Sequence, residues 1–402
     1  MSTTIEALRP RLDRLQRLAL VVGVVGFVGC AVGALAAPGS FYPAYLVAFL
    51  FWAGLAMGCV AITMLHHLTG GAWGQMIRHP LESGSMTLVL MALLLLPIFL
   101  GLKTLYPWTD AEVIRQHAAV AHKVAYLNPT AWLTRGIGYF IVWIVFGFLL
   151  RRWSAKQDET EDPAPSRWCQ RLSGPGLAIV FLTASFAAID WGMSLEPEWY
   201  STIYGPMLII GWGLETFAFM VAAAILLKRY EPLPPDLVTD EFNDLGNLML
   251  AFVMLWAYMS FSQFLIIWSG NLAEEIPWYL RRTRGGWQWV AVALIVFHFF
   301  APFFFLLFRD AKRKTELLLA VSALILVMHL LNLAWLVLPA GSHDSLHPVI
   351  PWGAVLMVPL AMLGIGGVWV AVFVAGLKDR SLVPLHDPNI DPANEMKGGT
   401  VQ

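Results

Sequence analysis

Residues 181–220 read FLTASFAAIDWGMSLEPEWYSTIYGPMLIIGWGLETFAFM. Two apolar runs flank a short polar segment, and each run contains one carboxylate, Asp190 before the segment and Glu215 after it. A carboxylate without a partner in hydrocarbon costs about 3 kcal/mol or more, so it usually faces a bundle interior or a hydrated path. Counted from the starts of their predicted helices, Asp190 lies ~21 Å and Glu215 ~15 Å along the axis. Both therefore lie in the half of the membrane nearest the 195–204 loop, as expected of proton-handling groups.

The composition indicates a membrane protein. Hydrophobic residues make up 58% of the chain and charged residues only 13%, which is too apolar for a soluble protein of 402 residues. We predict an all-α integral membrane protein with about ten transmembrane helices of roughly 20 residues each. The predicted spans are 18–37, 43–66, 84–105, 131–152, 176–195, 205–227, 245–268, 286–308, 316–338 and 353–376.

The placement of Lys and Arg in the predicted loops sets the orientation. Basic residues concentrate on the side that carries both termini, so both termini are expected in the cytoplasm. The chain then divides into five regions: an amphipathic N-terminal segment 1–17, helices one to four in 18–152, a cytoplasmic loop 153–175, helices five to ten in 176–378, and a C-terminal tail 379–402.

Several classes of site are not indicated. The three cysteines are scattered without a Cys-x-x-Cys pair, so the chain has no ligand set for an iron–sulfur cluster and no c-type haem attachment motif. The near-neutral net charge gives no sign of a nucleic-acid partner. We predict no metal site, and no motif for phosphate binding or nucleophilic catalysis occurs.

Three further polar residues lie inside predicted spans, namely Gln263, His298 and His329. Together with Glu215 they come from four consecutive helices at overlapping depths, so they can converge on one interior. Histidine titrates near neutrality, which suits proton transfer. We take Asp190, Glu215, Gln263, His298 and His329 as the candidate proton-transfer residues. Two alternatives stay open: that the polar residues only pack and form hydrogen bonds, and that the two histidines are axial ligands of a b-type haem.

A second candidate site is a quinone site near the outer end of the fourth helix. Arg135 and Tyr139 are four residues apart and lie on one helix face. Both can donate a hydrogen bond to a quinone carbonyl, and the quinone would lie near Asp190 and Trp191. There are two competing interpretations. The two residues could anchor a partner subunit, or Arg135 could simply extend its charged group to the membrane interface.

Three stretches closely resemble one family: AAIDWGMSLEPEWYSTIYG (187–205), DLGNLMLAFVMLWAYMSFSQFLIIWSGNLAEEIPWYLRRTRGGW (244–287) and FHFFAPFFFLLFRDAKR (297–313). They are similar to the second quinone-binding-type membrane subunit of bacterial quinol:cytochrome c oxidoreductase, alternative complex III. That subunit belongs to the polysulfide-reductase-like (NrfD-like) membrane family. The specific similarity covers residues ~170 to 340, and the remainder matches in hydropathy and length.

The resemblance implies a fold, a setting and partners. The family fold is two four-helix bundles, helices 2–5 and 6–9, flanked by helices 1 and 10. The implied setting is the bacterial inner membrane. The partners would be a sister NrfD-like subunit, iron–sulfur and multihaem cytochrome c subunits, membrane lipids and a menaquinol or ubiquinol pool. The subunit itself is expected to carry no redox cofactor, with the haems and iron–sulfur clusters on its partners.

One departure from the family pattern affects the activity. The quinol-binding sister subunit uses a His and an Asp, whereas the fourth helix here supplies Arg135 and Tyr139 but no His. We therefore expect a proton-transfer and docking subunit rather than the one that carries the redox chemistry, and assign no catalytic residue. The alternatives are a quinone-binding redox anchor and a stand-alone proton-coupled secondary transporter.

Overall fold

The computed structural model describes residues 3–74, 76–228, 235–341 and 348–380, and within them it contains helices and no strands. Ten helices in this described part are long and apolar enough to cross a membrane, which confirms the predicted helical, multi-pass class. The ten spans are Leu8–Ala36, Pro38–Thr69, Arg78–Leu100, Pro129–Glu159, Ala164–Leu195, Tyr204–Leu227, Glu241–Gly270, Trp287–Leu307, Thr315–Gly341 and Trp352–Lys378.

The long helices are joined by short ones. The long helices are α1 (Thr3–Ala36), α2 (Pro38–Thr69), α9 (Pro129–Glu159), α10 (Ala164–Trp191), α11 (Tyr204–Lys228), α12 (Pro235–Gly270), α17 (Thr315–Val337) and α18 (Trp352–Lys378). The shorter ones are η1 (Ala72–Gly74), α3 (Arg78–Ser85), α4 (Leu88–Leu94), α5 (Leu96–Leu100), α6 (Leu102–Leu105), η2 (Pro107–Thr109), α7 (Ala111–Gln116), α8 (Ala118–Ala121), η3 (Met193–Leu195), α13 (Ile276–Thr283), α14 (Trp287–Ala293), η4 (Leu294–Phe300), α15 (Ala301–Leu307), α16 (Arg309–Arg313) and η5 (Leu338–Gly341).

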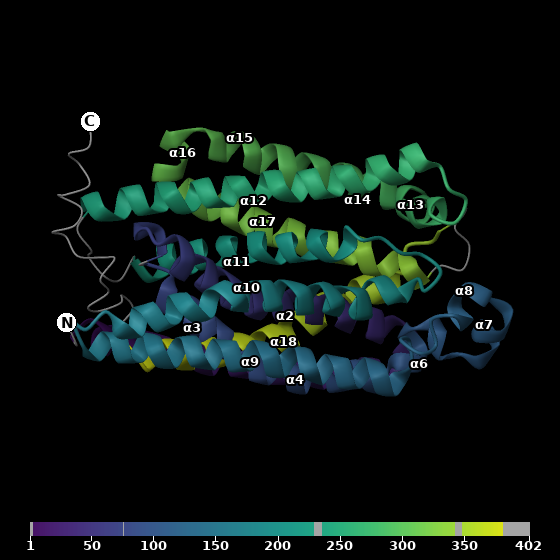
Figure 1. Cartoon of the computed structure of the whole chain (residues 1–402), viewed down its shortest axis with the longest axis horizontal. Coiled ribbons are helices and arrows are strands. Elements are labelled where there is room, and N and C mark those ends of the chain that lie inside the picture. The colour runs from purple at the N-terminus through teal and green to yellow at the C-terminus, as the bar shows by residue number, and fades with distance from the viewer. Residues whose placement is uncertain (1–2, 75, 229–234, 342–347, 381–402) are drawn as a thin grey trace.

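The helices run roughly side by side, so the molecule has two ends (Figure 1). We call the end that holds the start of α1 and the end of α18 the terminal face. The opposite end, which holds α7, α8 and α13, is the loop face (Figure 1). The start of α1 and the end of α18 share one end because an even number of passes returns the chain to the face from which it started.

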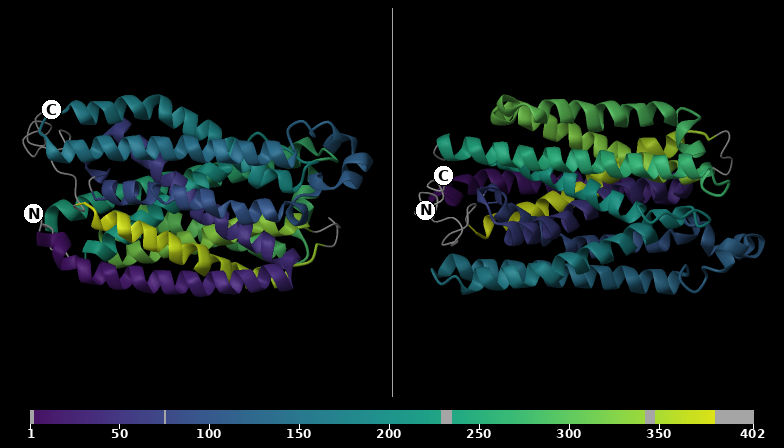
Figure 2. Two further views of the ribbon diagram at one scale, coloured as in Figure 1. Left: turned by 90° about the horizontal axis from the view of Figure 1, so that it is seen from below. Right: turned by 45° about the horizontal axis from the view of Figure 1, so that its top comes forward.

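Helix α2 is the centre of the molecule. Its sequence is apolar on all sides, and a helix of that kind is stable only when it is surrounded. Here α2 packs against α18, α11, α10, α3 and α17, and 89% of its most apolar stretch is buried. The same fraction is 33% for α9 and for α10, which lie at the edge of the molecule (Figure 2).

The second half of the chain packs around α11. This helix contacts α12 and α17, and the span α14–η4–α15 in turn contacts both α12 and α17. On its other side α11 packs against α2 and α10. Residues of α11 therefore face two groups of helices at once, which is the position needed to gather polar groups from several helices.

Helices α1 and α18 form a closely packed pair. A Cβ placed on Gly26 of α1 would lie 2.4 Å from the Gly364 nitrogen of α18, so only glycine allows this approach. The amphipathic stretch predicted for residues 1–17 continues without a break into the first span, because α1 is one helix from Thr3 to Ala36.

One predicted connection and one predicted span differ from the structure. The predicted loop 153–175 is mostly helical: α9 continues to Glu159 and α10 begins at Ala164. The stretch RRWSAKQDE consists largely of good helix formers, so the helix extends beyond its apolar part into water. The third span is interrupted after Ser85, where the Thr87 hydroxyl donates to the Gly84 carbonyl at 2.6 Å. Residues 381–402 of the predicted tail lie outside the described part.

Candidate functional site

A buried carboxylate and imidazole meet between α11 and α17. Glu215 lies near the middle of α11 and His329 in α17, and both side chains are fully buried. His329 Nε2 lies 3.4 Å from Glu215 Oε2, an ion-pair separation without the geometry of a hydrogen bond. The two acid–base groups predicted from neighbouring helices are therefore brought together.

His298 adds a third buried group from the next span. Its ring is stacked on that of His329, with centroids 6.0 Å apart and planes inclined by 26°. The ring of Trp256 in α12 also packs on His298, in a T-shaped arrangement with centroids 4.3 Å apart. Glu215, His329 and His298 thus form a row, which we call the buried triad.

The backbone around His298 is unusual. Residues Leu294–Phe300 form a π-helical segment, η4. Such segments are rare in proteins, and those that occur often lie at functional sites. Four residues after His298, Pro302 has no N–H to donate to the His298 carbonyl, and its ring crowds that carbonyl. The proline therefore gives a local reason for the widened helix, and the widening helps to set the direction of the imidazole.

The polar atoms of the buried triad lack hydrogen-bond partners among the described residues. Both carboxylate oxygens of Glu215 and both ring nitrogens of each histidine are buried and form no hydrogen bond within the described residues. Buried polar groups in proteins are nearly always satisfied, commonly by ordered water. Six buried nitrogen and oxygen atoms without a hydrogen-bond partner in the described part of the chain thus lie together between α11, η4 and α17.

Asp190 has a different environment. Arg135 donates from Nε to Oδ2 and from Nη2 to Oδ1, both at 2.8 Å, and the Tyr139 hydroxyl donates to Oδ2 at 2.8 Å. Three donors therefore converge on one buried carboxylate, two of them from a charged guanidinium. The structure thus joins three of the predicted quinone-site residues into one cluster. The proton-transfer role of Asp190 stays a prediction, and its geometry is that of a fixed ion pair.

The surroundings hold this cluster rigidly. The guanidinium of Arg135 also donates to the Tyr126 carbonyl at 2.8 Å and lies 3.7 Å from the centre of the Tyr126 ring. Burial, and next the charge of Asp190, raise the pKa of the Tyr126 phenol, so that this group stays protonated. Trp191, the fourth predicted member, is fully buried against Phe140, and its indole does not join the polar contacts.

Gln263 lies apart from the buried triad. Its side-chain oxygen accepts a hydrogen bond of 2.5 Å from the Ser201 hydroxyl in the loop after α10. Along α12 it is seven residues beyond Trp256, a rise of about 10 Å. Its predicted proton-transfer role is untested, and the structure places it at the loop face rather than beside the histidines.

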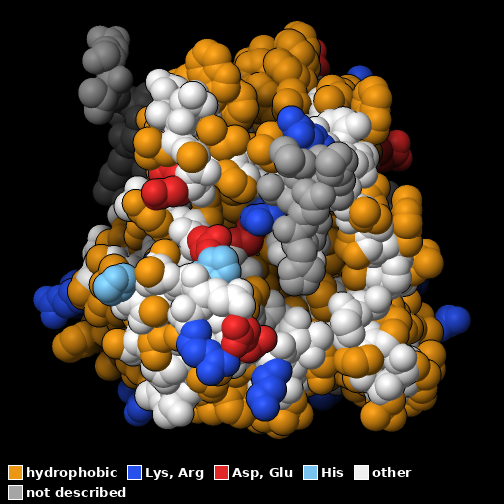
Figure 3. Space-filling model, turned by 90° about the vertical axis from the view of Figure 1, so that its right-hand side faces the viewer, with side chains coloured by type: hydrophobic (Ala, Val, Ile, Leu, Met, Phe, Trp, Pro, Cys, Tyr) orange, Lys and Arg blue, Asp and Glu red, His pale blue; other side chains and the backbone are white. Residues whose placement is uncertain are grey.

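The loop between α10 and α11 is clamped by charged residues that were not among the predicted site residues. Glu196 accepts from Arg281 Nη1 at 2.5 Å and from Arg282 Nη2 at 2.6 Å. The Arg282 guanidinium lies 3.8 Å from the centre of the Trp278 ring, which stacks on Trp199. Charged side chains gather on this loop face amid apolar and neutral surface (Figure 3). The clamp fixes the segment that joins α10 to α11.

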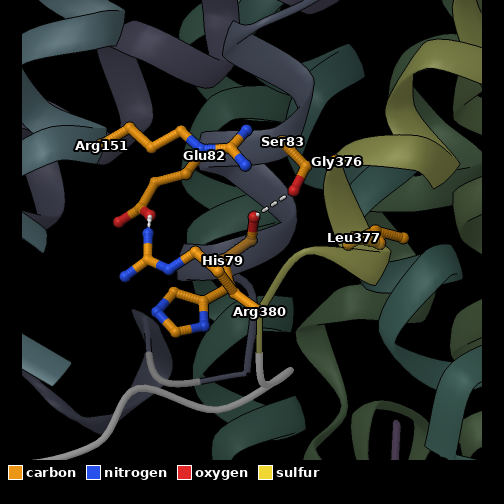
Figure 4. Close-up of a pocket in the computed structure, with 7 residues that line it drawn as sticks. All are labelled: His79, Glu82, Ser83, Arg151, Gly376, Leu377 and Arg380. Carbon is orange, nitrogen blue, oxygen red and sulfur yellow. Dashed lines mark hydrogen bonds and ion pairs between the residues drawn. The ribbon is translucent and has the colours of Figure 1, made fainter. Parts of the chain in front are cut away.

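A second polar cluster lies at the terminal face (Figure 4). Arg380, just after α18, donates to Glu82 Oε2 at 2.7 Å and also pairs with Asp158. His79 Nε2 lies 3.5 Å from Asp158 Oδ2. The cavity beside them, about 10 Å³, has room for about one water molecule. The opposite charges are paired, so the cluster fastens the end of α18 to α3 and α9.

Sequence reasoning also missed Gly211. A Cβ at this position would lie 2.7 Å from Cε1 of His329, and its three nearest atoms all belong to that imidazole. Gly211 is one helical turn before Glu215, so the missing side chain admits the ring beside the carboxylate. A glycine inside a helix, four residues before a buried acid, was the available signal, since glycine there costs about 0.5–1 kcal/mol.

The comparisons with known proteins give no relative. No protein-family model matches the chain, and no curated protein matches it significantly. Within the described residues, no three His, Cys, Asp or Glu side chains are arranged as ligands of a metal ion.

Proposed function

We propose that this chain is an integral membrane subunit of a quinol-oxidising electron-transport complex. In this proposal it carries no redox centre of its own and transfers protons through Glu215, His329 and His298. The observation that carries the proposal is the convergence of these three fully buried acid–base groups from three spans, with their polar atoms unsatisfied by protein.

The geometry supports short proton steps. A shift of a few tenths of an ångström brings His329 Nε2 and Glu215 Oε2 from 3.4 Å into hydrogen-bond distance. A centroid separation of 6.0 Å between the two imidazoles suits one bridging water between ring nitrogens. Imidazole can accept a proton at one nitrogen and release another from the second, which makes it a suitable relay.

The proposed arrangement is two four-helix bundles flanked by the first and last helices, with both termini in the cytoplasm of a bacterium and the protein in its inner membrane. The mutual contacts of α2, α3, α9 and α10 support the first bundle, and those of α11, α12, α15 and α17 support the second. The pairing of α1 with α18 supports their place outside both. The terminal face would then be the cytoplasmic one.

The proposed partners follow from the resemblance of residues 187–205, 244–287 and 297–313. They are a sister NrfD-like subunit and subunits with iron–sulfur clusters and c-type haems, fed by a menaquinol or ubiquinol pool. Purification of the chain from its native membrane in mild detergent tests this. We expect haem absorbance and iron to elute with it. A chain that elutes alone, without haem bands, would instead fit a stand-alone proton-coupled transporter.

A quinone site at Arg135 is the second candidate. The observation that favours it is that Arg135 pairs with Asp190, which also accepts from Tyr139, while 22% of the Arg135 side chain remains exposed, so that a ligand can approach the guanidinium. A quinone held there would accept a hydrogen bond from Arg135. The test is the amount of quinone extracted per purified protein. If replacing Arg135 by Met removes the quinone, the chain acts as a quinone-binding redox anchor.

Replacing Gly211 by Ala should disturb the buried triad selectively. The new methyl group meets only His329 among its nearest atoms, so the imidazole must move away from Glu215. We expect proton uptake by the assembly to fall about tenfold, since a positioned acid–base group contributes about 10²–10⁴ and the group is displaced rather than removed. The measurement is proton uptake by the reconstituted assembly, followed with a pH indicator.

Gly213→Ala is the matched control. It adds the same methyl group two residues further along α11, where the nearest atom, 2.4 Å away, belongs to the Phe252 ring. We expect similar packing strain, of about 1–3 kcal/mol, but near-normal proton uptake. Equal losses in the two variants would mean that the Gly211 effect is general strain, not displacement of His329.

A further inference from the structure

Two tryptophans are stacked on the surface of α9 and α10 near the terminal face, where the apolar part of α9 ends. The rings of Trp153 in α9 and Trp168 in α10 have centroids 5.6 Å apart and planes inclined by only 17°. Trp168 keeps 44% of its surface exposed. Tryptophan favours the headgroup level of a membrane, where one part of the ring is in apolar surroundings and the indole N–H is in water.

Two cations flank this pair. Lys156 Nζ lies 4.7 Å from the centre of the Trp153 ring, and Arg171 Cζ lies 5.4 Å from the centre of the Trp168 ring. Each cation is three residues after its tryptophan, which places both on one helix face. We call Trp153, Trp168, Lys156 and Arg171 the basic aromatic patch.

The cations of the patch are not engaged in ion pairs with described residues, although the adjoining segment 158–162 carries four carboxylates. Lys156, Arg171 and the neighbouring exposed Arg152 form no ion pair with any carboxylate of the described residues. Arg167, also exposed, is 4.0 Å from Asp162, and a pair so exposed on both sides contributes little. Elsewhere on the terminal face, Arg380 and Arg78 have acidic partners. Lys156 and Arg171 therefore keep their charges free to contact an anion from outside the described residues.

The apolar surface next to the patch indicates which kind of anionic ligand is complementary to it. Toward the middle of the spans, α9 exposes Phe148 and Val145, and α10 exposes Ile179 and Leu182. Both helices are peripheral, with one face open to the membrane. A ligand that fills the whole surface has a phosphate at the cations and hydrocarbon on these side chains. A protein helix packed here would have to bury unpaired cations, which is costly in lipid.

We propose that the basic aromatic patch binds the headgroup of an anionic phospholipid. The guanidinium of Arg171 and the ammonium of Lys156 donate to the phosphate oxygens, and the exposed edge of Trp168 lies at the glycerol level. The acyl chains run along Phe148 and Leu182. Basic residues at the ends of spans attract anionic lipid, and this patch adds an aromatic surface that fixes its position. The inference does not depend on the proton-transfer proposal.

The test measures retention of phosphatidylglycerol. The full chain is reconstituted in nanodiscs of phosphatidylcholine with a minor fraction of phosphatidylglycerol, re-extracted in mild detergent, and analysed for bound lipid by native mass spectrometry. The double variant Lys156→Gln/Arg171→Gln should retain about 25-fold less phosphatidylglycerol, or about fivefold less for each charge. Trp168→Leu should lower retention severalfold with the charges intact. Added salt should lower wild-type retention.

Matched variants separate a site from diffuse attraction. Arg14→Gln/Arg17→Gln removes the same charge from exposed positions on α1 at the same face, and should retain wild-type amounts. Trp268→Leu removes a tryptophan that is even more exposed, 69% against 44% for Trp168, at the loop face and should have no effect. The single variant Lys156→Arg, which keeps the charge and the fold, should retain lipid. The proposal would be overturned if Lys156→Gln/Arg171→Gln and Arg14→Gln/Arg17→Gln lost equal amounts of phosphatidylglycerol. It would also be overturned if Lys156→Gln/Arg171→Gln lost none.

Discussion

Replacing Glu215 by Gln should lower proton uptake by the assembled complex about 100-fold, the range expected for removal of a positioned acid–base group. Gln keeps the size of the side chain and its capacity for hydrogen bonds, but it cannot release a proton. Because the carboxylate is fully buried and makes no hydrogen bond to the described protein, its removal should leave the fold intact. Proton uptake is followed in liposomes with a pH indicator during quinol oxidation.

The control is the same substitution at Glu316, an exposed residue in the first turn of α17. Glu316→Gln removes one negative charge but no buried acid, so uptake should stay at the wild-type level. His329→Gln should reproduce the Glu215 result, since the two groups are 3.4 Å apart. Wild-type stoichiometry in both Glu215→Gln and His329→Gln would rule out the buried triad as a proton route.

Replacing Arg135 by Met should produce the largest loss of stability. Among the described residues, the substitution leaves the fully buried Asp190 carboxylate with only the Tyr139 hydroxyl as side-chain donor. Breaking a buried ion pair from one side costs about 3–5 kcal/mol, because the remaining charge is uncompensated. The free energy of unfolding in mixed micelles, measured by denaturant titration, should fall by that amount.

The double variant Arg135→Met/Asp190→Asn tests the cause of that loss. Removing the charge of Asp190 as well eliminates the uncompensated carboxylate, so most of the stability should return, as it does when buried pairs are replaced together. The double variant is compared with the single variants Arg135→Met and Asp190→Asn. If its loss of unfolding free energy equals the sum of the two single losses, the Arg135–Asp190 ion pair, with its contacts of 2.8 Å, does not stabilise this end of α9 and α10.

Hydropathy was sufficient to find the spans but not their ends. All ten predicted runs correspond to membrane-capable helices, because a stretch of about 20 apolar residues has no stable place in water. The ends were missed where helices continue into water, as α9 does to Glu159 and α10 does from Ala164. Hydropathy measures solubility in lipid, whereas helix continuation depends on backbone hydrogen bonding and helix propensity.

The candidate residues were partly visible in the sequence. Acids and histidines in apolar runs are recognisable because they are costly there, and Glu215, His298 and His329 were found in that way. Their partners were not. Asp190 lies 55 residues from Arg135, and the ion pair depends on how α9 and α10 are rotated against each other. Gly211 acquires its importance only through His329, which comes from another span.

The sequence by itself determined that this chain is helical, crosses the membrane many times and contains buried acid–base groups, because the cost of placing each residue in lipid is local and adds along the chain. Only the tertiary structure decided that Glu215 meets two imidazoles while Asp190 is neutralised by Arg135, and that Gln263 stands apart. Such convergence depends on the rotation and register of whole helices, which are set by packing between residues far apart in the chain.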